Sequence, residues 1–267
     1  MKTKVIIVGA AGRMGKRFIA LATESGDFEI VGAVDMLNSP DFGKDAGLAA
    51  GTSLAYLTIT DTFPTLETEV VVDFSMPDAL DKNLYFCIEN HIPLVCGTTG
   101  MNPDQKEKIK DASQIIPILY TTNMSVGMNV LFSLAGKVAT MLGDDYDIEI
   151  IEQHHRFKKD APSGSALTIA EKICEATERD YPGSLVHGRS GKDTTRQKGE
   201  IGMHAIRAGD ITGVHSVIFA CLGETFTLNH TANSRDTFIR GALRAAKWIV
   251  GKESGLYSMA DVLGLKE

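Results

Sequence analysis

The chain has 267 residues, 43% of them hydrophobic and 23% charged, a composition that is typical of globular proteins and argues against disordered or fibrous folds. At roughly 150 residues per domain, this length predicts one large domain or two modest ones. The 27 Lys and Arg against 34 Asp and Glu give a net charge of −7, so we expect no nucleic-acid partner. An anionic ligand would have to be held by a local group of basic residues.

The four cysteines, Cys87, Cys96, Cys174 and Cys221, are widely spaced. No pair has the spacing of zinc ligands, so we expect no metal site. The pattern favours a reducing, cytoplasmic location. The sequence contains no apolar run of about 18 residues, and we therefore expect no transmembrane helix and no membrane partner.

The first 124 residues alternate apolar runs with helical stretches. Buried strands are predicted at 5–8, 29–35, 69–74, 93–96 and 115–120, with loop at 36–53 and a short edge strand at 56–59. Helices are predicted after the first, third and fourth of the buried strands. Strands that alternate with helices predict βαβ units and an α/β fold with a doubly wound parallel sheet.

The pattern changes after residue 124. A long helix is predicted at 125–142, a strand at 147–152, a helix from an N-cap at Ser163 to about 178, and loop at 183–200. Strands at 203–207, 214–222 and 224–230 follow, and the chain closes with a helix at 235–250 and a short tail. This half is typical of an α+β unit with an antiparallel or mixed sheet.

Three glycines, Gly9, Gly12 and Gly15, lie between the first strand and the first helix. Glycines at such a turn let backbone amides approach a pyrophosphate at the positive end of the helix dipole. The spacing is G-x-x-G-x-x-G, and the alternative is a turn that only allows close packing.

Asp35 ends the second strand, 20 positions after Gly15, where dinucleotide-binding folds place an acid on the adenosine ribose hydroxyls. A carboxylate there repels a 2′-phosphate, and Met36 offers no positive charge. NADH is therefore favoured as the cofactor. NADPH is the alternative, since Lys16 and Arg17 at the start of the helix could reach a phosphate.

Two further loops, Gly97–Gly100 and Thr121–Met124, end parallel strands at the same predicted edge of the sheet. Their amides and hydroxyls could touch the nicotinamide end of the cofactor. Individually, each loop is also compatible with an ordinary turn.

Residues 154–159 form a basic cluster with His154, His155 and Lys158 in an acidic protein. A solvated charge run or a core histidine is the alternative. However, Ser163–Ser165 follows at a predicted helix N-terminus, which suits a carboxylate. Histidine and lysine also suit proton donation.

Four segments together resemble the 4-hydroxy-tetrahydrodipicolinate reductase family, also called dihydrodipicolinate reductase: Gly9–Gly15, Gly97–Gly100, Asn123–Gly127 and Glu152–Ala166. The resemblance continues through 188–191, 199–202 and 255–259, and so covers nearly the whole chain in order.

The resemblance implies roles for individual residues. His154 matches the proton donor and acceptor, Lys158 a proton donor, and His155 a substrate-binding histidine. Gly164 and Ser165 match the pair that holds a substrate carboxylate. The matching cofactor-binding residues are Gly9, Ala10, Ala11, Gly12, Arg13, Met14, Asp35, Gly97, Thr98, Thr99, Thr121, Thr122, Asn123 and Met124.

The implied reaction transfers a hydride from the nicotinamide to C4 of an unsaturated ring formed when the 4-hydroxyl leaves as water. His154 or Lys158 then supplies a proton. The substrate is a dicarboxylate. The resemblance also implies a Rossmann-type dinucleotide-binding domain at 1–124 and 235–267, and a substrate-binding and oligomerisation domain at 125–234 that forms a homotetramer. One departure is Met36, which stands where members that accept NADPH often carry arginine.

Two other functions compete with this interpretation. A semialdehyde dehydrogenase would need a nucleophilic cysteine, for which Cys96 is the candidate. A regulator that senses the dinucleotide without turnover would not need the pair of His154 and Lys158.

Overall fold

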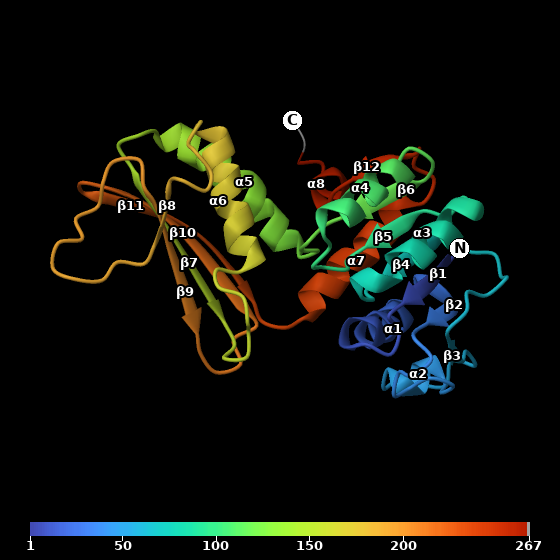
Figure 1. The fold of residues 1–267 in the computed structure, drawn as a ribbon. Helices are drawn as coiled ribbons and strands as arrows, with labels where there is room; N and C mark the ends of the chain where they lie inside the picture. Colours follow the sequence, from blue (N-terminus) through green and yellow to red (C-terminus); the bar gives the residue numbers. More distant parts are fainter. Residues whose placement is uncertain (266–267) are drawn as a thin grey trace. The chain divides into compact units, whose positions relative to one another are not determined.

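The computed structural model describes residues 1–265 and contains two compact units (Figure 1). Unit 1 comprises Met1–Ser125 and the chain from Phe238 onward, and unit 2 comprises Val126–Thr237. Residues 266 and 267, which end the predicted first domain, lie outside the described residues. No helix within residues 1–265 has the length and apolar character needed to cross a membrane.

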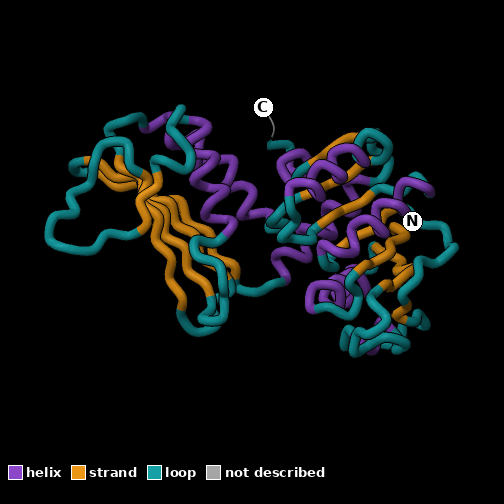
Figure 2. The backbone as a smooth tube through the Cα atoms, in the orientation of Figure 1, coloured by secondary structure: helices purple, strands orange, loops and turns teal. Residues whose placement is uncertain are grey.

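Unit 1 is built on a seven-stranded parallel sheet with the order β12-β6-β5-β4-β1-β2-β3. Figure 2 shows its strands in orange among purple helices. The strands are β1 (Thr3–Val8), β2 (Phe28–Val34), β3 (Ile59–Thr60), β4 (Val70–Asp73), β5 (Leu94–Cys96), β6 (Pro117–Tyr120) and β12 (Gly255–Tyr257). The central strands carry β-branched runs that are buried throughout, as a sheet covered on both faces requires.

The helices of unit 1 are α1 (Arg13–Ser25), α2 (Ala46–Ala49), α3 (Leu80–Glu89), α4 (Pro103–Ala112), α7 (Asp236–Ile249) and α8 (Met259–Leu263), with a 3₁₀ turn at Pro77–Ala79. The first two residues of α7 belong to unit 2 and the rest of the helix to unit 1. The strand order runs one way from β1 to β2 and the other way from β4 to β6. Because crossovers are right-handed, α1 lies on one face of the sheet, and α3 and α4 lie on the other. The order therefore reverses between β1 and β4, where α/β sheets bind their ligands.

Unit 2 contains a five-stranded mixed sheet with the order β11-β10-β7-β9-β8. Its strands are β7 (Asp147–His154), β8 (Leu185–His187), β9 (Ile201–Arg207), β10 (Gly213–Cys221) and β11 (Glu224–Ala232), and its helices are α5 (Val126–Leu142) and α6 (Gly164–Ala176). The helices pack on one face, where Val217 and Phe219 of β10 are fully buried. The alternate residues Ser216 and Ile218 are only partly buried on the other face. Together the two sheets confirm the predicted fold class.

Short elements account for most of the errors in the predicted secondary structure. The segment 183–200, predicted as loop, contains β8. The edge strand is Ile59–Thr60 rather than 56–59, α2 lies inside the predicted loop at 36–53, and the C-terminal tail forms β12 and α8. Such elements have little periodicity of their own, and their neighbours in space determine where they form.

A histidine is buried in the core of unit 2. His215 is 4% exposed on β10, and its Nε2 atom lies 3.0 Å from the Ser163 hydroxyl at the start of α6. Burial disfavours the charged imidazolium and lowers the pKa of His215 to about 4. The side chain is therefore neutral at pH 7, and protonating it costs folding free energy.

We expect the free energy of unfolding to fall as the pH drops from 7 to 5. The unfolded chain binds a proton at His215 near pH 6.5, whereas the folded chain binds it only near the lowered pKa, so the loss at pH 5 is about 2 kcal/mol. Urea unfolding at pH 7 and at pH 5 measures this loss of unfolding free energy. In His215→Asn the loss should shrink by that amount, whereas replacing the exposed His187 by Asn should leave it unchanged. An equal loss in all three proteins would contradict the prediction.

Candidate active site

The turn between β1 and α1 requires glycine for steric reasons. Gly9 has a φ of +81°, and a Cβ atom there would lie 2.5 Å from the Phe74 carbonyl oxygen, just after β4. A Cβ on Gly15 would lie 2.1 Å from the Gly9 carbonyl oxygen, so this glycine lets the helix pack on the turn. The turn therefore closes tightly at the point where the strand order reverses.

The N-terminus of α1 is arranged to receive an anion. The N-cap is Gly12, which makes no side-chain cap, so the amides of the first turn keep their hydrogen-bonding capacity. Gly12 and Arg13 are exposed, whereas Gly9 and Ala10 are buried beneath them. These features fit the pyrophosphate of a dinucleotide.

Asp35 follows β2 directly and is half-buried. Its Oδ2 atom accepts a hydrogen bond from the Ala11 amide at 2.7 Å, and Oδ1 accepts one from the Met36 amide at 2.8 Å. The carboxylate is thus fixed beside the glycine turn. Met36 itself is 54% exposed.

A second acid occupies the loop after Asp35. Asp41 forms ion pairs with Lys16 of α1 and with Lys44, the latter at 2.7 Å. Its side chain is 13% exposed, and the two lysine hydrogen bonds hold its pKa below the usual range. Lys16, one of the two residues that the sequence suggests for contacting a 2′-phosphate, is therefore engaged by a carboxylate, whereas the other, Arg17, is exposed.

The loops after β5 and β6 lie at the same edge of the sheet as Gly9 and Asp35. Thr98 is buried and its hydroxyl has no hydrogen-bond partner within residues 1–265. The backbone of Thr121–Met124 is held by the Thr121 hydroxyl, which accepts from the Asn123 amide at 3.3 Å. Thr99 and Thr122 are exposed. All the predicted cofactor-binding residues therefore follow the carboxyl ends of parallel strands, and the Thr98 hydroxyl provides an orphaned polar group for a ligand.

Cys96 is unsuited to nucleophilic catalysis. It is fully buried at the end of β5, and burial together with nearby Asp73 raises the pKa of its thiol far above the usual range. The reactive thiolate is therefore inaccessible at neutral pH. Within residues 1–265, no cluster of His, Cys, Asp and Glu is arranged to hold a metal ion.

His154 lies in a buried polar network at the carboxyl end of β7. The strand extends two residues beyond the predicted end at Glu152, because β7 pairs with β9 as far as His154 and Arg207. Glu152 is fully buried, and its Oε2 atom lies 2.5 Å from Nδ1 of His154. The two oxygens of Glu152 also accept hydrogen bonds from both terminal nitrogens of Arg207, at 2.7 and 2.8 Å, and from the Ser163 amide at 3.0 Å.

This network sets the charge states of its members. Burial on its own raises the pKa of Glu152, but hydrogen bonds from Arg207 and His154 outweigh it, and the pKa is lowered. Burial lowers the pKa of His154, against the opposing effect of Glu152. The site therefore contains an ionised carboxylate, an arginine and a largely neutral imidazole.

The remaining residues that the sequence suggests for unit 2 follow His154 in the chain. Lys158 lies in the loop after β7, 22% exposed, with its ammonium 2.9 Å from the Asp160 carboxylate. Gly164 and Ser165 begin α6, and open space surrounds Gly164 where a Cβ atom would project. His155 is half-buried, and its buried Nδ1 atom has no partner among the described residues.

Sequence reasoning missed Glu152, Arg207 and His215. The alternation of strand residues could have placed Glu152 and His154 on the same face. Nothing in the sequence reveals the register of β7 against β9, which brings Arg207 to the pair.

The geometry of the two units agrees with comparisons to known proteins. Models of the N-terminal and C-terminal parts of dihydrodipicolinate reductase match residues 3–124 and 127–263. The 4-hydroxy-tetrahydrodipicolinate reductases of Syntrophotalea carbinolica and Syntrophus aciditrophicus are both 44% identical over 265 residues, which is 98% of this chain and 99% of theirs.

Solved structures support the fold. A dipicolinate-bound dihydrodipicolinate reductase from Paenisporosarcina sp. TG-14 superposes with a TM-score of 0.75 at 20% identity, covering 98% of this chain and 99% of that one. A myo-inositol dehydrogenase from Corynebacterium glutamicum gives a TM-score of 0.57 at 15% identity, covering 99% and 94%. From the matching models and the full-length relatives, this chain belongs to the dihydrodipicolinate reductase family.

Proposed function

We propose that the chain catalyses the NAD(P)H-dependent reduction of 4-hydroxy-tetrahydrodipicolinate, with loss of water, to tetrahydrodipicolinate in the diaminopimelate route to lysine. The observation that carries this proposal is the 44% identity to enzymes of that name over their full length. The buried acid–base network around His154 supports it, because a sensor without turnover has no use for such a site.

The residues of unit 1 fit a nicotinamide dinucleotide, which supplies a hydride when bound. The amides at the start of α1 would bind its pyrophosphate, and Asp35 would accept hydrogen bonds from the ribose hydroxyls. The unpartnered Thr98 hydroxyl and the loop Thr121–Met124 would contact the nicotinamide end.

The residues of unit 2 fit a dianionic substrate. The amides of Gly164 and Ser165 at the N-terminus of α6 would bind one carboxylate, with His155 beside it. A proton for the ring would come from His154 or from the Lys158 ammonium. Substrate carboxylates stabilise an imidazolium, so binding favours the protonated form of His154.

Replacing Lys158 by Ala tests its assignment as a proton donor. We expect kcat to fall by about 10²- to 10⁴-fold with little change in the Kd of NADH, because Lys158 belongs to the unit that lacks the glycine turn. The assay follows the loss of NADH absorbance with 4-hydroxy-tetrahydrodipicolinate as the substrate. The control is Lys159→Ala, which removes a neighbouring exposed ammonium. An unchanged rate would remove Lys158 from the mechanism, and a wild type that binds NADH without turnover would favour a sensor.

We infer that NADH is the preferred cofactor. The Asp35 carboxylate is fixed by the Ala11 amide, and the exposed Met36 adds no charge that would offset repulsion of a 2′-phosphate. Lys16 and Lys44 are both engaged by Asp41. A 2′-phosphate that binds Lys16 would therefore have to compete with an existing ion pair.

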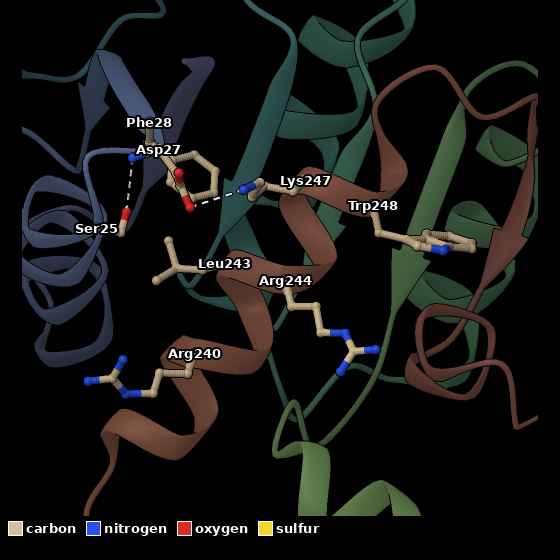
Figure 3. A pocket seen from close by; sticks show the side chains of 8 residues that line it. All are labelled: Ser25, Asp27, Phe28, Arg240, Leu243, Arg244, Lys247 and Trp248. Atoms are coloured by element: carbon tan, nitrogen blue, oxygen red, sulfur yellow. Dashed lines mark hydrogen bonds and ion pairs between the residues drawn. The ribbon is translucent and has the colours of Figure 1, made fainter. Parts of the chain in front are cut away.

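Releasing Lys16 should improve NADPH binding. We expect Asp41→Asn to lower the Kd of NADPH, and that of adenosine 2′,5′-bisphosphate, by about 3- to 10-fold, with little effect on NADH. Calorimetry measures all three. The matched control is Asp27→Asn, which breaks the ion pair with Lys247 at the amino-terminal edge of the sheet (Figure 3). Equal changes for NADH and NADPH would exclude Asp41 as a specificity determinant.

We also propose a homotetramer formed through the open face of the sheet in unit 2. That face carries side chains such as Ile151, Ile206, Ile218 and Thr227, which α5 and α6 do not cover. Apolar and β-branched side chains on an uncovered sheet face favour association.

The four free cysteines, three of them buried, are consistent with our proposal of a cytoplasmic location.

Light scattering should give the mass of four chains for the wild type. Ile218→Lys places an ammonium in the middle of the open face, and we expect it to yield smaller species. The control, Tyr85→Lys, alters an exposed side chain on α3 in unit 1. A monomeric wild type, or an Ile218→Lys protein that remains tetrameric, would refute the proposed interface.

A further inference from the structure

The Glu152 carboxylate is the most completely enclosed charge in the candidate site. It has no exposed surface, and its four hydrogen bonds come from Arg207, His154 and the Ser163 amide. A carboxylate offers about four lone-pair positions, so its accepting capacity is filled. The guanidinium balances its charge, which makes the burial energetically acceptable.

This geometry determines which nitrogen of His154 carries the proton. An ionised carboxylate can only accept hydrogen bonds, so the contact of 2.5 Å between Oε2 and Nδ1 places a proton on Nδ1. In the neutral ring, Nε2 then holds the free lone pair. In the imidazolium, Nε2–H is the bond that remains free to donate.

The space beside Nε2 is kept open by a glycine. A Cβ atom on Gly213, at the start of β10, would lie 3.2 Å from Nε2 of His154. The other ionisable groups facing this ring are Lys158, His215 and Arg207, and the His215 ring packs edge-on with its centroid 5.2 Å away.

Arg207 links this pair to the loop that carries Lys158. Its Nη2 atom donates to the Asp160 carbonyl oxygen at 2.6 Å, and the Asp160 carboxylate pairs with Lys158. A single arginine therefore contacts both the carboxylate behind His154 and the residue that pairs with Lys158.

We propose that Glu152 and Arg207 form a positioning pair that holds His154 in the Nδ1-protonated tautomer and leaves Nε2 free to exchange a proton with the substrate. Neither residue touches the substrate in this proposal. The inference rests on the proposed function, because it assumes that His154 takes part in proton transfer.

The first test is ¹⁵N NMR of histidine-labelled wild type, with the His154 signals assigned from a His154→Gln variant. We expect neutral His154 to be protonated on Nδ1 and unprotonated on Nε2. Protonation on Nε2, or an even mixture of tautomers, would overturn the proposal. This readout needs no substrate, so it stands even if the proposed reaction fails.

The second test is kinetic. In Glu152→Gln we expect a mixture of tautomers, a kcat reduced by about 10- to 100-fold, an altered pH profile and little change in KM or in NADH affinity. The matched control is Glu149→Gln on the same strand. Glu149 also binds a histidine and two arginines, His204, Arg189 and Arg196, but it lies on the opposite face. It should change neither the His154 tautomer nor kcat.

A third variant covers the case in which Glu152→Gln does not fold. Gly213→Ala keeps Glu152 and places a methyl group against Nε2. We expect kcat to fall while the tautomer stays as in the wild type. A wild type without turnover would refute the proposed function, whereas full activity in Gly213→Ala or in a folded Glu152→Gln would refute only the positioning role.

Discussion

A carboxylate removed entirely from water organises the candidate site of unit 2. Placing Glu152 in the interior would cost several kcal/mol without compensation, and removing one partner of such a pair typically costs about 3–5 kcal/mol. Its partners come from β7, β9 and the start of α6. The strand pairing, the helix start and the loop between them are therefore constrained together.

The two faces of β7 show how environment separates similar residues. Glu149 and Glu152 each bind arginine and histidine. Glu149 lies on the open face of the sheet with 23% of its side chain exposed, whereas Glu152 has none exposed. Only Glu152, through its partner Arg207, is connected to the loop that carries Lys158. We therefore assign a role in the reaction to Glu152 and none to Glu149.

In the proposed function, unit 1 brings backbone amides close to the pyrophosphate of the cofactor. The missing side chains of Gly9 and Gly15 allow β1, α1 and the end of β4 to meet, since any Cβ there would overlap backbone atoms. The proposed preference for NADH rests on two carboxylates near this turn, Asp35, which the turn fixes, and Asp41, which engages Lys16. The buried, poorly ionisable Cys96 removes the main chemical reason to consider a semialdehyde dehydrogenase.

The sequence by itself determined the fold class, the glycine turn and the family, because β-branched runs, helix starts and contiguous motifs are local features. It also placed His154 and Lys158 in one basic segment. Only the tertiary structure decided that β7 runs on to His154, that 183–200 contains β8, and that Arg207 and Glu152 form a pair 55 residues apart in the chain. These features depend on strand register and on the balance of buried charge. Both are set by contacts between distant segments, which a local pattern does not encode.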